Sequence, residues 1–143
     1  MALPARQPTD LAAVFAAFRP ILEPYIPRMT VIQDNERGLY LNTRSMMKNR
    51  QPLFFASIAI NKNYVSFHLF PVSMYPDLLD GIGDLANRMQ GKSCFNFRKV
   101  DPNQVEGMRA LVAAGHRRLE TEGDITSGGG QPRQSETSGP SGP

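Results

Sequence analysis

Two apolar segments joined by three polar residues constrain the fold of this chain more than any other feature. Residues 53–60 are almost all apolar, as in a central strand that is covered on both faces. Residues 64–70 alternate instead, so that the odd-numbered residues form one apolar face. Because only Asn61-Lys62-Asn63 separates the two segments, we expect them to be antiparallel neighbours in a sheet.

The remaining periodic segments predict three helices and three further strands. Helices are expected over residues 9–26, 76–89 and 102–120, and strands over residues 29–33, 39–43 and 93–98. Thr9 can cap the first helix, and Asp101 before Pro102 is typical of a helix start. This order predicts an α+β single domain with an N-terminal helix, a mostly antiparallel five-stranded sheet, a short helix before the last strand and a C-terminal helix. We expect the terminal helices to pack on one face of the sheet.

The two ends of the chain differ in composition from its middle. Residues 123–143, GDITSGGGQPRQSETSGPSGP, are dominated by Gly, Ser, Pro and Thr, and such a segment buries too little surface to fold. We therefore expect a disordered tail there and a flexible N-terminus over residues 1–8. The domain itself is expected over residues 9–122, which is long enough for one core.

The charge and the cysteine content limit the classes of partner. The net charge of +3 is compatible with anionic partners, but the chain has no dense run of Lys and Arg, so we do not expect nucleic-acid binding. Neither a signal peptide nor an apolar segment of membrane-spanning length is recognisable, so we expect no membrane partner. A single cysteine, Cys94, excludes an internal disulfide and favours a cytoplasmic location.

Gly91-Lys92-Ser93 matches the last three letters of a phosphate-binding P-loop. That motif also needs a glycine where Ala86 stands, and it needs the order strand, loop, helix. The predicted order here is helix, loop, strand, so the P-loop interpretation is rejected. Lys92 instead follows the end of a predicted helix, where its positive charge is favourable beside the partial negative charge of the helix C-terminus. The alternative role for Lys92 is contact with a ligand.

Cys94 and His68 allow two interpretations. A thiol beside an imidazole would indicate a cysteine nucleophile with its base. The two residues lie on different predicted strands whose register the sequence does not give, so nothing brings them together. A buried cysteine acting as a small apolar residue is the interpretation that we favour, and we expect ordinary thiol reactivity.

Two segments of the chain resemble the YdhG-like family, a domain family of unknown function with a frataxin-like iron-chaperone branch. They are PLFFASIAINKNYVSFHLFP, and GKSCFNFRKVDPNQVEGMRALVAA after the short helix. Within them Lys92 and Phe97 match a basic element of the family, and Asp101-Pro102 matches the turn that opens its last helix. The resemblance spans about residues 10–118 and implies an α+β domain with a curved sheet. The first helix offers only Asp10 and Glu23 as acids, which argues against an iron-chaperone role.

We expect a non-enzymatic domain that binds a small anionic or aromatic ligand, with no catalytic residue and no cofactor. The elements that the resemblance brings together carry aromatic, hydroxyl and cationic groups, and the pocket residues that we predict from them are Lys92, Ser93, Phe95, Tyr64 and His68. The alternative is metal handling, and the acids that could ligate a metal, spaced by three and four, are Asp77, Asp80 and Asp84. A third interpretation is an interaction module or a homodimer joined along a sheet edge.

Overall fold

One antiparallel sheet organises the fold, and its strands lie in the order in which they occur in the chain. The structure is a computed structural model, and it describes residues 10–125. The sheet order is β1-β2-β3-β4-β5, and every neighbouring pair is antiparallel. The strands are β1 (Thr30–Asn35), β2 (Gly38–Met46), β3 (Pro52–Ile60), β4 (Val65–Leu69) and β5 (Cys94–Phe97). The predicted α+β class and the predicted antiparallel pairing of residues 53–60 with 64–70 are therefore confirmed.

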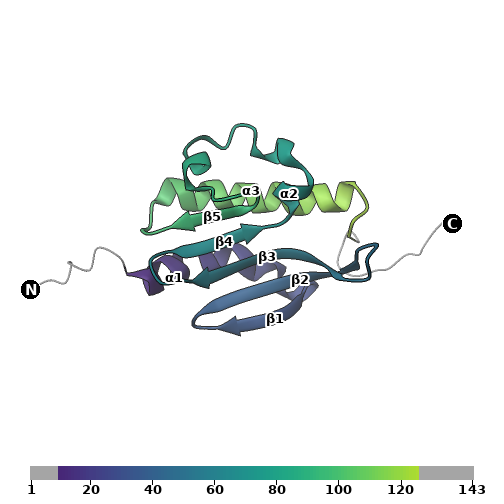
Figure 1. The fold of residues 1–143 in the computed structure, drawn as a ribbon, viewed down its shortest axis with the longest axis horizontal. Helices are drawn as coiled ribbons and strands as arrows, with labels where there is room; N and C mark the ends of the chain where they lie inside the picture. Colours follow the sequence, from purple (N-terminus) through teal and green to yellow (C-terminus); the bar gives the residue numbers. More distant parts are fainter. Residues whose placement is uncertain (1–9, 126–143) are drawn as a thin grey trace, which may run out of the picture.

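Two helices cover one face of this sheet and leave the other face without a helical layer (Figure 1). They are α1 (Leu11–Leu22) and α3 (Pro102–Thr121). The first helix passes into a 3-10 segment, η2 (Glu23–Arg28), where Pro24 and Pro27 prevent regular helical bonding. Asp10 caps α1 by accepting a hydrogen bond from the Ala13 N–H. The predicted cap, Thr9, lies outside the described residues.

The core lies between the two helices and the sheet. Phe18 of α1 is fully buried, stacks on Phe97 with ring centroids 4.3 Å apart, and meets Phe67 edge-on at 6.1 Å. The start of α3 is as predicted, because the Asp101 side chain accepts from the Asn103 N–H and Pro102 occupies the first turn. The residues that form the apolar face of α3 are buried, and they are Val105, Met108, Leu111, Val112 and Leu119.

A β-bulge in β3 determines which residues face the core. Leu41 pairs with Ala56 and Asn42 with Phe54, so Phe55 is the extra residue on β3. Phe55 and Ala56 are both fully buried, whereas Phe54 turns to the opposite face. The bulge therefore places an aromatic ring on the face that the helices do not cover.

The segment before β5 differs from the predicted helix over residues 76–89. The structure has a short helix, α2 (Pro71–Met74), followed by the 3-10 turns η3 (Pro76–Leu79) and η4 (Gly83–Arg88). Gly81 and Gly83 both have positive φ, +80° and +61°, which a regular helix does not allow. The predicted periodicity is present, but these two glycines divide the segment into separate turns.

The end of α3 is attached to η3 by a compact polar cluster. Arg118 donates two hydrogen bonds to Asp77 at 2.8 and 3.2 Å, and its guanidinium lies 4.6 Å from the centroid of the Tyr75 ring. The Tyr75 hydroxyl donates to Asp124, which raises the pKa of Tyr75 to about 12. Asp124 belongs to the segment that we expected to be disordered, so the folded domain extends to Ile125 in the structure.

The predicted flexible N-terminus, residues 1–8, and residues 126–143 of the predicted tail lie outside the described residues. Among residues 10–125 no helix combines the length and the apolar character needed to cross a membrane.

Candidate functional site

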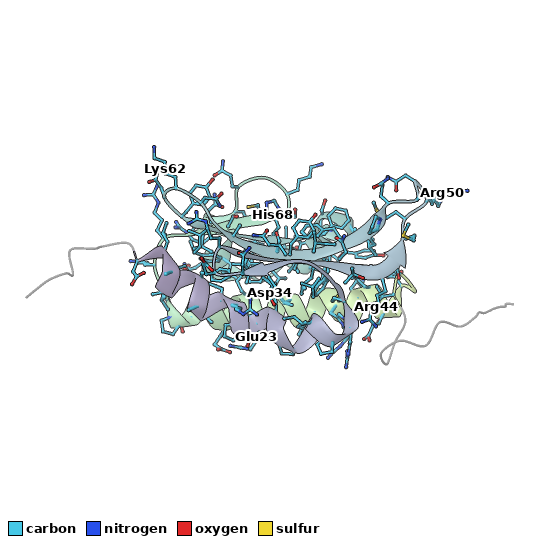
Figure 2. The ribbon with its side chains drawn as sticks, turned by 90° about the horizontal axis from the view of Figure 1, so that it is seen from below. Glu23, Asp34, Arg44, Arg50, Lys62 and His68 are labelled. Carbon is cyan, nitrogen blue, oxygen red and sulfur yellow. The ribbon has the colours of Figure 1, made fainter. Side chains whose placement is uncertain are left out.

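The open face of the sheet is the face turned away from α1 and α3. Strand pairing defines its residues, because side chains alternate between the two faces along each strand. Figure 2 shows His68 on this side of the sheet, and Glu23 and Asp34 on the side of the helices. The paired residues of the four strands β2 to β5 that belong to this face are Gly38, Tyr40, Asn42, Met46, Pro52, Phe54, Ser57, Ala59, Ser66, His68, Cys94 and Asn96.

A cavity of about 440 Å³ opens where this face meets η4. The sheet contributes Tyr64, Asn96 and Arg98 to its wall. The side of η4 contributes residues 87–90, which are Asn87, Arg88, Met89 and Gln90. A volume of this size is typical of a small-molecule site. We call this cavity the Arg88–Arg98 pocket.

Strand register positions both walls of the Arg88–Arg98 pocket. Val65 pairs with Phe97, so the next residues outward, Tyr64 and Arg98, lie side by side at the end of β4 and β5. On the other wall, Met89 forms an isolated antiparallel bridge with Phe95, and the Gln90 N–H donates to the Cys94 carbonyl at 2.8 Å. The η4 segment is thereby held against the outer edge of β5.

The lining of the pocket is electropositive. Two guanidinium groups, three carboxamides and one phenol line it, and none of the lining residues is acidic. The Arg88 Nε is buried and has no hydrogen-bond partner among the described residues. Buried polar atoms in proteins are nearly always hydrogen-bonded, so an unpaired donor on a residue that lines the cavity is unusual.

A second hollow of about 370 Å³ lies beside the first, and Arg98 lines both. Its other lining residues are Leu11, Lys62 and Asn63. The turn between β3 and β4, predicted from sequence as a simple connection, thus adds a third cation beside the two arginines.

The structure does not bring the five predicted pocket residues together. Tyr64 lines the Arg88–Arg98 pocket, and His68 lies further along the open face. Lys92 lines a different cavity of about 390 Å³, together with Val72, Ser73, Pro76, Leu79, Met89 and Gly91. Phe95 is fully buried on the helix side of the sheet, because it alternates with Cys94 and Asn96. Ser93 is half-buried at the start of the same strand.

His68 and Cys94 are direct partners across β4 and β5, which the sequence could not show. Their side chains share the open face, but the Cys94 thiol donates to the Asn96 Oδ1 at 3.5 Å. Burial raises the pKa of the Cys94 thiol and lowers the pKa of His68. Both groups are therefore favoured in their neutral forms, the opposite of the thiolate–imidazolium pair of a cysteine nucleophile.

The acids considered as metal ligands do not form a site. Asp77 is engaged by Arg118, and the hydrogen bond from this arginine lowers the Asp77 pKa. Asp80 and Asp84 belong to separate turns rather than to one helix face. Throughout the part of the chain that the structure describes, no three His, Cys, Asp or Glu side chains gather closely enough to hold a metal ion.

Sequence reasoning missed Arg88, Arg98 and Asn96 as site residues. Arg88 lies in the segment that was predicted as one regular helix over residues 76–89, and that helix does not form. The alternation of Cys94, Asn96 and Arg98 was visible in the sequence, and it would have indicated the correct face had the partner strand's register been known.

Comparison with protein-family models, with curated proteins and with solved structures finds no match to this chain.

Proposed function

We propose that this domain binds a small anionic ligand in the Arg88–Arg98 pocket, without catalysing a reaction on it. One observation carries the proposal: Arg88 and Arg98 face a cavity that contains no acidic lining residue, and the Arg88 Nε has no partner among residues 10–125. Planar guanidinium groups suit carboxylate and phosphate oxygens because two parallel N–H donors match two oxygens. Tyr64 supplies a ring beside them, so an anion that also carries an aromatic group fits the lining best.

Thermal unfolding with inorganic phosphate and with phenyl phosphate tests this proposal. A ligand present at 100 times its Kd stabilises the native state by about 2.7 kcal/mol, which raises the melting temperature measurably. We expect phenyl phosphate to stabilise the wild type more than phosphate does, and Arg98→Ala to abolish both effects. If neither anion stabilises the wild type at millimolar concentration, the proposal is wrong.

Lys92→Ala is the matched control, because it also removes one positive charge but lines the neighbouring cavity. We expect this variant to respond to both anions as the wild type does. Loss of the response in Lys92→Ala but not in Arg98→Ala would favour the pocket expected from the sequence and would refute the one proposed here.

We also propose that the chain is related to the YdhG-like family, which it resembles in the two segments quoted above. A cytoplasmic location is part of the same proposal, and the single cysteine supports it. The iron-handling alternative has the weaker support, since Asp77 is already paired with Arg118. Iron titration by calorimetry at neutral pH tests it directly, and absence of heat removes it.

A homodimer joined along a sheet edge is a second candidate, because β1 is exposed along its whole length. Val31 and Ile32 are 40% and 57% exposed, and among residues 10–125 no strand pairs with the outer edge of β1. Sedimentation equilibrium gives the mass. A dimer that Ile32→Lys converts to a monomer supports this candidate, and a monomeric wild type at high micromolar concentration eliminates it.

A further inference from the structure

The geometry points to the open face of the sheet as a binding surface for single-stranded nucleic acid, with bases stacked on Tyr40, Phe54 and Phe70. This inference goes beyond the proposed anion site, because none of its three stacking rings lines the Arg88–Arg98 pocket. It also differs from the expectation drawn from the sequence, where the lack of a dense Lys/Arg run argued against such a partner.

Aromatic rings gather at the centre of this face. Tyr40 of β2 stacks on Phe54 of β3 with ring centroids 4.8 Å apart and an interplanar angle of 26°. The Phe70 ring follows at 6.0 Å from Phe54, and the His68 ring at 6.5 Å. Tyr40 is 36% exposed and the other three are half-buried, so this cluster presents ring surface to solvent. Every base has a π-face, and stacking on exposed rings is how sheet surfaces hold single strands.

The outward residues of one strand connect this cluster to the arginines. Tyr64, Ser66, His68 and Phe70 alternate along β4 and its two flanking positions, which spans about 20 Å at the usual rise per residue. Tyr64 is at the end next to Arg98, and Phe70 is at the end next to Phe54. An extended chain of nucleotides can therefore follow β4 from one aromatic group to the next.

The composition of the face argues against a second protein as its occupant. Among the residues that strand pairing assigns to the open face in β2 to β5, none is Val, Ile or Leu, and the aliphatic side chains are Ala59 and the pair Met46 and Pro52 at one end of the face. Sheets that pack on another sheet or helix interdigitate many branched aliphatic side chains, which this surface lacks. It offers Asn42, Ser57 and Asn96 instead, whose hydrogen-bonding groups suit the edges of unpaired bases.

The charges around the face complement a phosphate backbone. Figure 2 shows Lys62 and Arg50 on the same side of the sheet as His68, at opposite ends of the molecule. Arg98 and Lys62 line the same hollow. Within the paired residues of β2 to β5 on this face, no side chain is acidic. Cations at the ends of an uncharged aromatic surface are the arrangement that tracks a single strand.

Fluorescence anisotropy with a labelled oligothymidylate of about 12 nucleotides tests the inference with the full chain. We expect saturable binding to the single strand and weaker binding to a duplex of the same length. If Arg50, Lys62 and Arg98 each neutralise one phosphate, the affinity falls about 20-fold between about 50 and about 200 mM salt. Tyr40→Leu keeps apolar bulk but removes the stacking ring, and we expect it to weaken binding about fivefold or more.

Two matched controls separate this surface from general electrostatics and from misfolding. Arg117→Ala removes an exposed cation from α3, on the opposite side of the sheet, and should bind as the wild type does, whereas Lys62→Ala should bind more weakly. Circular dichroism and melting temperature verify that Tyr40→Leu is folded. Equal weakening by Lys62→Ala and Arg117→Ala, an unchanged affinity in Tyr40→Leu, or no binding by the wild type at low salt would each overturn the inference. A wild type that responds to phosphate but binds no oligonucleotide would refute this surface while leaving the anion pocket intact.

Discussion

Replacing Arg88 by methionine separates the role of this side chain in ligand binding from its effect on folding stability. In the unliganded protein the Arg88 Nε is buried without a hydrogen-bond partner among the described residues. A buried unsatisfied polar atom costs about 1–3 kcal/mol, and methionine fills similar space with no such atom. Arg88 as a whole is only half-buried and its charge is lost in the variant, so part of the gain is offset. We therefore expect Arg88→Met to raise the free energy of unfolding by about 1 kcal/mol.

Urea denaturation followed by circular dichroism measures this change. With an m-value of about 2 kcal/mol/M, a gain of 1 kcal/mol moves the unfolding midpoint up by about 0.5 M. Adding phosphate should reverse the order, because the wild type gains stability and the variant does not. Arg109→Met, which removes an exposed arginine paired with Glu106, is the control and should change stability by less than about 0.5 kcal/mol. Destabilisation of the unliganded protein by Arg88→Met, or an undiminished response to phosphate, would refute the reasoning.

Three further predictions follow from the packing. His116 is buried, which lowers its pKa below 6.5, so the unfolded state takes up a proton first as the pH falls. The free energy of unfolding should therefore be constant between about pH 7 and about pH 8 and decrease below pH 6.5, with a smaller decrease in His116→Gln; an identical pH profile for the two proteins would contradict this. Cys94 should react with iodoacetamide near neutral pH more slowly than free cysteine, because burial raises its thiol pKa, and His68→Ala should not slow it further. Fast alkylation that depends on His68 would restore the nucleophile hypothesis. Gly115→Ala should destabilise the protein by about 1–2 kcal/mol in urea denaturation, because the new Cβ would lie 3.1 Å from the Pro71 Cβ. A stability equal to or above that of the wild type would show that α2 can move away.

The fold was largely predictable because β1 to β4 follow one another as hairpins. A turn of three residues between two β-segments leaves antiparallel pairing as the simple solution, and residues 53–70 pair as expected. The prediction of one helix over residues 76–89 was wrong for a local reason, since Gly81 and Gly83 adopt positive φ. Their identity was visible, but a glycine in a sequence does not reveal which sign of φ it adopts.

The candidate site was less predictable, because it depends on register. The bulge at Phe55 and the pairing of Val65 with Phe97 decide which side chains share the open face. A shift of one residue would have exchanged Phe95 with Cys94 and moved Arg98 to the helix side. Alternation within one strand was therefore readable from the sequence, whereas the juxtaposition of Arg98 with Tyr64, and of His68 with Cys94, was not.

The strands lie side by side in the sheet in the same order as in the chain, and this affects how the protein reaches its native state. β2, β3 and β4 each join a strand that was synthesised just before them, so these loop closures are short and this part of the sheet can grow by successive hairpins. β5 joins β4 only after α2, η3 and η4 have been made, and α3 covers the core face after this last strand. During synthesis, the part of the core that α3 covers, such as Phe55 against His116, therefore remains accessible to chaperones until α3 leaves the ribosome, and docking of that helix ends the interval in which the nascent chain can aggregate.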